Sequence, residues 1–122
     1  MPRINTRYAS GPLDEVVYGA AEAAGMPLSV ISGYDGVGFA WRWRMGDAER
    51  AELRDVVFRI RPSPADVFTA EVAVEGSSHS PVPKPSTWSS VARKDLPSPA
   101  ALDESWLTTE LRAAAERAAR PH

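Results

Sequence analysis

The side chains best suited to recognise a ligand are the tryptophans and arginines that alternate along residues 39–44. The segment reads Phe-Ala-Trp-Arg-Trp-Arg. In an extended strand, this alternation sends Trp41 and Trp43 to one face and Arg42 and Arg44 to the other. Rings and cations on a shared surface could stack bases and hold phosphates, but on opposite faces they cannot easily contact the same ligand. We therefore predict that the tryptophans enter the core and that the arginines lie on an outer face.

Two further arginines, Arg59 and Arg61, extend this outer face if the segment around them forms the neighbouring strand. Glu71 and Glu75 have matching spacing on the segment that follows. Cross-strand ion pairs are the simplest interpretation, because opposite charges on neighbouring strands attract each other. The alternatives are a face that binds another protein, and weak binding of nucleic acid through the arginine face of residues 40–61.

Trp88 lies in a segment rich in serine and proline, residues 76–99, which predicts a long loop. Its ring either pins this loop to the body of the domain or is exposed for a partner. Tryptophan and arginine are the residues that most often anchor protein interfaces. The candidate protein-binding residues are therefore Trp88, Arg42, Arg44, Arg59 and Arg61.

Patterns typical of catalysis or metal binding are missing from the sequence. Of the two histidines, His79 lies in the predicted loop and His122 is the last residue, and neither has an obvious partner for acid–base chemistry. Cysteine, the Gly-x-Ser-x-Gly motif and metal-ligand spacing are all absent. The glycines of residues 33–38 are spaced differently from the dinucleotide fingerprint and precede a strand, so they predict a turn at 33–36 or a close backbone approach. We expect no catalytic residue, no metal and no cofactor.

Hydrophobic periodicity predicts an α+β fold with an antiparallel sheet of four to five strands, flanked on one face by an N-terminal and a C-terminal helix. Pro12 suits the start of the first helix and Gly25 its end, while Ser98 suits the cap of the last helix. The predicted elements are a helix over 12–24, strands over 28–31, 37–45, 52–61 and 67–75, a short edge strand over 87–91 and a helix over 99–119. Residues 1–122 have the length of a single domain.

Two neighbouring apolar stripes run along the last predicted helix. One contains Leu102, Trp106, Thr109 and Ala113, and the other contains Leu107, Leu111, Ala114 and Ala118. An alternative prediction is a pocket between the sheet and the two helices. Its lining would be Phe39, Trp41, Phe58 and Trp106, which makes a small-molecule-binding or enzymatic domain an alternative function.

Composition and charge favour a soluble domain that binds another protein. The net charge of −2 is too small to indicate nucleic acid or a membrane surface as the partner. The sequence contains no apolar run typical of a signal peptide or a membrane span, so we expect a cytoplasmic protein. Its alanine, arginine and proline content suggests a bacterial source, and the alanine-rich run 111–120 could form a homodimer seam. We predict a small, non-enzymatic protein-interaction domain with an accessory or regulatory role.

Overall fold

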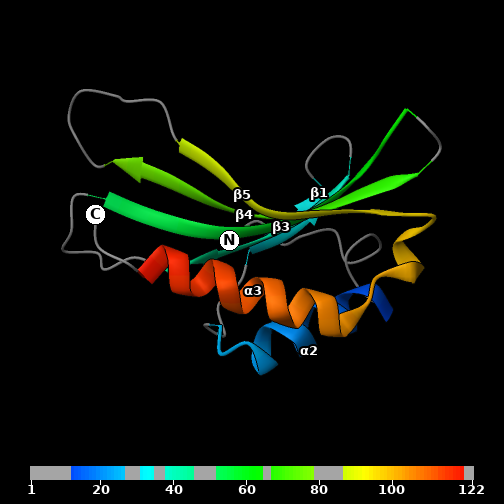
Figure 1. Ribbon diagram of the computed structural model, residues 1–122, viewed down its shortest axis with the longest axis horizontal. Coiled ribbons are helices and arrows are strands. Elements are labelled where there is room, and N and C mark those ends of the chain that lie inside the picture. The colour runs from blue at the N-terminus through cyan, green and yellow to red at the C-terminus, as the bar shows by residue number, and fades with distance from the viewer. Residues whose placement is uncertain are drawn as a thin grey trace.

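Five antiparallel strands form one sheet in the order β1-β2-β3-β4-β5, and two helices cover one of its faces (Figure 1). The computed structural model describes residues 12–26, 31–34, 38–45, 52–64, 67–78 and 87–119. Its elements are α2 (Pro12–Ala23), β1 (Ile31–Tyr34), β2 (Phe39–Arg44), β3 (Glu52–Pro62), β4 (Phe68–Ser78), β5 (Thr87–Leu96), the 3-10 turn η1 (Pro99–Ala101) and α3 (Glu104–Ala119). The predicted α+β fold, with one helix from each end of the chain, is confirmed. We call the sheet face under the helices the inner face and the opposite one the outer face.

The inner face carries the large apolar side chains of the central strands. Trp41, Phe58 and Val72 lie opposite one another in register across β2, β3 and β4, and all three are buried. The helices complete this core with small and branched side chains, namely Val17, Ala20, Leu107, Leu111, Ala114 and Ala118. Burial of this apolar surface is the main force that holds helices to sheet. The predicted alternation of inward and outward residues in β2, β3 and β4 is therefore confirmed.

The N-terminal helix ends as its sequence predicts. Gly25 adopts a positive φ of 78°, and the amide of Met26 donates to the carbonyl of Ala21 at 2.9 Å. The amide of Gly25 donates to Glu22, which completes a Schellman motif. A third carbonyl, that of Ala23, accepts a hydrogen bond from Arg112 of α3 at 2.9 Å. The end of α2 is thus fixed both by its own glycine and by the neighbouring helix.

The last helix begins later than predicted. Residues 99–101 form a separate 3-10 turn, and Leu102 is extended, so the α-helix starts at Glu104. Asp103 is the actual cap, since its Oδ1 accepts from the amide of Ser105 at 3.1 Å, whereas Ser98 makes no side-chain capping bond. Of the two predicted stripes, the one with Leu107, Leu111, Ala114 and Ala118 is confirmed as the buried face. In the other stripe Trp106 is half-buried, and Thr109 and Ala113 are exposed. Neither helix of the described residues is long and apolar enough to span a membrane.

Much of the predicted serine- and proline-rich loop at 76–99 is strand. β4 continues to Ser78, and β5 runs from Thr87 to Leu96, so that only residues 79–86 lie outside the described part. The short edge strand predicted over 87–91 is confirmed and is longer than expected. Its pairing with β4 contains a register shift between Val72 and Ala73, which is a bulge. Trp88 therefore lies on an ordered edge strand rather than in a loop.

The first strand is shifted relative to its prediction. β1 covers Ile31–Tyr34, so that Gly33 and Tyr34, expected in a turn, pair with β2. Residues 28–30 and 35–37 lie outside the described part. At the start of β2 a Cβ on Gly38 would lie 2.1 Å from the carbonyl oxygen of Ile60. The predicted close backbone approach is confirmed at this glycine, because no larger residue fits without displacing β3.

Candidate functional site

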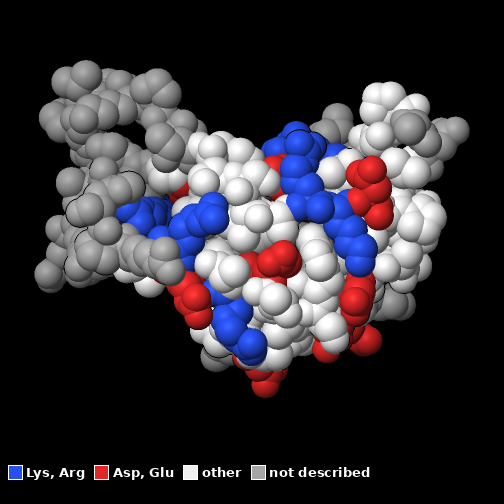
Figure 2. All heavy atoms as spheres, in the orientation of Figure 1, with Lys and Arg blue, Asp and Glu red and all other residues white. Residues whose placement is uncertain are grey.

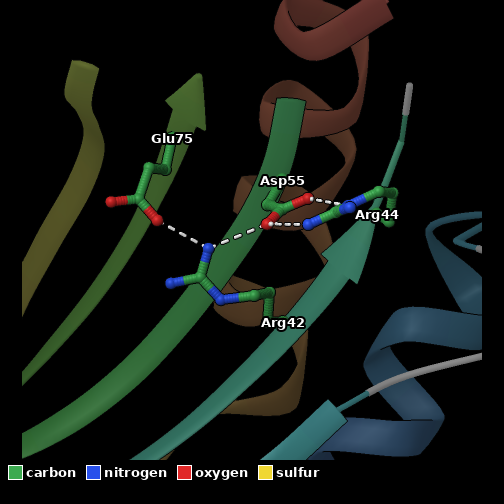
Figure 3. Close-up of polar contacts among 4 residues, drawn as sticks. All are labelled: Arg42, Arg44, Asp55 and Glu75. Carbon is green, nitrogen blue, oxygen red and sulfur yellow. Dashed lines mark hydrogen bonds and ion pairs between the residues drawn. The ribbon is translucent and has the colours of Figure 1, made fainter. Parts of the chain in front are cut away.

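The outer face of the sheet carries two groups of ion pairs, and each is built around a buried carboxylate. We call the first the Asp55 cluster; it contains Arg42, Arg44, Asp55 and Glu75 (Figure 3). Arg42 Nη1 lies 2.8 Å from Asp55 Oδ2 and 2.6 Å from Glu75 Oε1. Arg44 Nε lies 2.9 Å from the other oxygen of Asp55. One arginine thereby bridges β3 and β4, and the carboxylate of Asp55 holds both arginines of β2.

Burial makes the bonds of the Asp55 cluster stronger than those of ordinary surface ion pairs. The side chain of Asp55 is only 8% exposed. Burial on its own would lower the pKa of Arg42, but the hydrogen bonds with Asp55 and Glu75 and their charges outweigh it and raise this pKa. Every buried side-chain nitrogen and oxygen of the described residues has a hydrogen-bond partner. The cluster is therefore a satisfied, neutral network of two cations and two anions.

The second group, the Glu71 cluster, contains Glu71, Arg59, Trp88, Ser90 and Arg93. Oε1 of Glu71 accepts from Nη2 and Nε of Arg59 at 2.7 and 3.0 Å. Its Oε2 lies 3.5 Å from the indole nitrogen of Trp88 and 3.9 Å from Nε of Arg93. The side chain of Glu71 is 6% exposed, and this burial alone would raise its pKa. Hydrogen bonds from Ser90 and Arg59 and the charge of Arg59 outweigh burial and lower the pKa. Glu71 therefore remains ionised and holds residues from two neighbouring strands.

Trp88 is both held in place and exposed. The guanidinium of Arg59 lies 4.2 Å from the centre of its ring, which is a cation–π contact. The residue is nevertheless 37% exposed and is one of two exposed large hydrophobic residues in the described part, with Tyr18 of α2. The sequence predicted that the ring of Trp88 either packs against the domain or is exposed; in the structure it does both. Its ring is an exposed aromatic surface that Arg59 and Glu71 hold in place.

Two buried apolar residues lie between the two clusters on the outer side of the sheet. Val57 lies opposite Arg42 on one side and Ala73 on the other. Their exposed fractions are 2% and 0%, so they form no exposed apolar surface that a ligand could contact. The charged side chains of both clusters stand on the same sheet face as this pair.

The residues predicted to line a pocket are mostly part of the core. The rings of Trp41 and Phe58 are buried and stack with their centres 5.4 Å apart, and Phe39 lies 6.4 Å from Trp41. The indole of Trp41 donates to Asp14 of α2 at 3.0 Å, a link that the sequence pattern did not predict. Trp106 of α3 lies beside β5, the edge strand, where the ammonium of Lys94 is 5.7 Å from the centre of its ring. The structure therefore brings three of the four residues together and separates the fourth.

The predicted cross-strand ion pairs are present and include Glu71, but the sequence prediction missed Asp55, the centre of the other cluster. Arg59 pairs with Glu71 and Arg42 with Glu75, whereas Arg61 lies opposite Thr69. Asp55 and Arg93 were not predicted as site residues. Alternate residues of a strand share a face, so the sequence could have placed Asp55 on the same face as Arg59. Arg93 belongs to the unpredicted half of β5 and had no such signal.

The described residues contain no group of three or more histidine, cysteine, aspartate or glutamate side chains placed to hold a metal ion. On the face seen in Figure 2, acidic and basic side chains lie close to one another, with no large area of a single charge. Comparison with protein-family models, with curated proteins and with solved structures gives no match. The chemistry of the site must therefore be argued from its own geometry.

Proposed function

We propose that this chain is a small, non-enzymatic protein-interaction domain that binds a protein partner through the outer face of its sheet, with Trp88 as the central anchor. The observation that carries this proposal is the exposed ring of Trp88, held by the carboxylate of Glu71 and the guanidinium of Arg59. A tryptophan fixed in this way loses little conformational freedom on binding, so more of its contact energy contributes to affinity.

The surrounding arginines support the same function. Arg42, Arg44 and Arg59 are each engaged with carboxylates of neighbouring strands. Guanidinium groups held in this way are planar, partly exposed and preoriented, which suits contacts to backbone carbonyls and carboxylates of a partner. Their pairing with acids also reduces the positive field that phosphate binding requires. Protein is therefore the partner class that this surface fits best, and nucleic acid fits it less well.

The test is affinity capture from lysate of the source organism, with nuclease added, read by mass spectrometry. We expect a stoichiometric protein partner that is retained by the parent chain and lost by Trp88→Ala. The matched control is Tyr18→Ala, because Tyr18 is a similarly exposed aromatic residue, 41% against 37%, on a different element. Circular dichroism confirms that both variants are folded. A partner that Trp88→Ala retains as well as Tyr18→Ala does would show that the proposed surface is not the one used.

A further inference from the structure

The edge of the sheet at β5 is the most accessible part of the backbone next to Trp88. β5 is ten residues long and is the last strand in the sheet order, so β4 is its one neighbour among the described strands. Along its other side, the described residues supply no strand. An edge of this kind can accept an extended segment of another chain as an additional strand, through main-chain hydrogen bonds.

The charges along this edge select among possible segments. Arg93 is 67% exposed, and its neighbour Lys94 is exposed as well. Arg117 reaches from α3 to the same strand, where its Nη1 lies 3.2 Å from Oγ of Ser89. In Figure 2, basic side chains run across the surface where β5 lies in Figure 1. The edge thus presents three exposed cations.

The acidic groups Glu71 and Asp95 lie beside these cations. Glu71 is almost completely buried and already pairs with Arg59 and, at 3.9 Å, with Arg93. Asp95, at the end of the strand, is exposed and accepts from the hydroxyl of Thr69 at 3.3 Å. A partner segment with acidic side chains would gain attraction from the edge, while a basic segment would be repelled.

A second copy of this chain is a poorer occupant of the edge. Its own β5 would bring the same three cations to the contact, and like charges across paired strands are destabilising. The bulge opposite Val72 and Ala73 and the hydrogen bond from Arg117 to the carbonyl of Ser90 interrupt regular pairing with any added strand at the middle of β5. Strand addition is therefore limited to the flanking residues of β5, where the like charges favour a different chain over a second copy.

We infer that the partner contributes an extended, acidic segment that adds as a strand to the edge of β5, beside Trp88. It places carboxylates against Arg93 on the outer side of the sheet and against Lys94 and Arg117 on the inner side. This inference rests on the proposed function and makes it more specific, since it names the chemistry and conformation of the bound segment. Trp88 would contact an apolar side chain of the same segment, because its ring lies at the beginning of the strand on the outer face.

The test uses two labelled peptides that differ only in charge, one repeating Thr-Glu-Glu and one repeating Thr-Lys-Lys, so that an added strand carries charged side chains on both of its faces. Fluorescence anisotropy with the full chain at low salt is expected to show binding of the glutamate peptide alone. Arg93→Glu should weaken that binding roughly fivefold to tenfold, because an exposed attraction is replaced by a repulsion. The matched control is Arg112→Glu, which changes the net charge equally but lies on α3 beside the end of α2; it should leave the affinity within about twofold of the parent.

Two additional measurements separate the possible outcomes. Hydrogen exchange of the β5 amides should slow when the glutamate peptide binds, and a bound peptide without this protection would overturn strand addition. Equal binding of both peptides, binding of neither, or tighter binding of single-stranded DNA would overturn the acidic-segment inference. If the peptide test fails in any of these ways, capture of a protein partner that is lost with Trp88→Ala would still support the proposed function. Failure of the acidic-segment inference is therefore distinguishable from failure of the proposed function.

Discussion

Replacement of Glu71 by glutamine tests whether the outer face is a stabilising network. The carboxylate is 6% exposed and accepts two hydrogen bonds from Arg59 within 3.0 Å. Hydrogen bonds to charged groups contribute about 1.5–3 kcal/mol each, and removal of one partner of a buried pair costs about 3–5 kcal/mol. Glutamine retains an acceptor oxygen, and Arg59, whose side chain is 24% exposed, can regain water. We therefore expect Glu71→Gln to lower the free energy of unfolding by about 2 kcal/mol, less than the full cost of breaking a buried pair.

Urea denaturation followed by tryptophan fluorescence measures this change. At a slope typical of small domains, about 1–3 kcal/mol per molar urea, the midpoint should fall by about 1 M. Asp95→Asn is the control, because Asp95 is an exposed acid on the same face and its loss should change stability by less than about 0.5 kcal/mol. Combining Glu71→Gln with Arg59→Met should give a coupling energy of at least about 1 kcal/mol. A Glu71→Gln variant as stable as Asp95→Asn, with no coupling to Arg59, would refute this view of the cluster.

The other predictions concern pH and backbone packing. The folded state lowers the pKa of Glu71, so the unfolded chain binds the proton more tightly than the folded protein does. The ionised Glu71 therefore stabilises the folded state fully above the unfolded pKa near 4.5, and this stabilisation is lost as the pH falls through the lower folded pKa. Denaturation between pH 7 and pH 3 should therefore show a smaller loss of stability in Glu71→Gln than in the parent, and equal losses would contradict the assignment. Gly38→Ala should destabilise by about 2 kcal/mol, because its Cβ would meet a backbone oxygen of β3 at 2.1 Å. Gly19→Ala is the contrasting variant, because its Cβ would meet only the flexible side chain of Glu104, at 3.5 Å. This substitution should stabilise the helix by up to about 1 kcal/mol. Equal thermal midpoints for the two variants would argue against close packing at Gly38.

The sequence predicted the central strands well because their inner side chains are large and regularly spaced. Trp41 and Phe58 alternate with polar residues, and this pattern has few alternative interpretations. β5 lacks such a signal, since the inner residues of an edge strand need not be large: Ser89 and Lys94 occupy inner positions there. The strand was therefore predicted over only half its length.

The start of the last helix and the ion pairs show two further limits. Ser98 and Asp103 are both acceptable caps, and only the extended conformation of Leu102 decides between them. The ion pairs depend on strand register, since a pattern of alternation indicates which face a side chain occupies but not which residue lies opposite it. The contact of Arg44 with Asp55 arises from that register.

The packing of α2 against α3 has a consequence for how the chain folds during synthesis. Gly19 of the first helix lies against Glu104 of the last one, and Arg112 donates to the carbonyl that ends α2. The inner face of the sheet cannot be fully covered until residues 104–119 have left the ribosome. Until then the nascent strands expose Trp41, Phe58 and their apolar neighbours, which are the surfaces that chaperones bind. Because α3 residues complete this core, we expect the inner face to reach its final packing only after α3 has been synthesised.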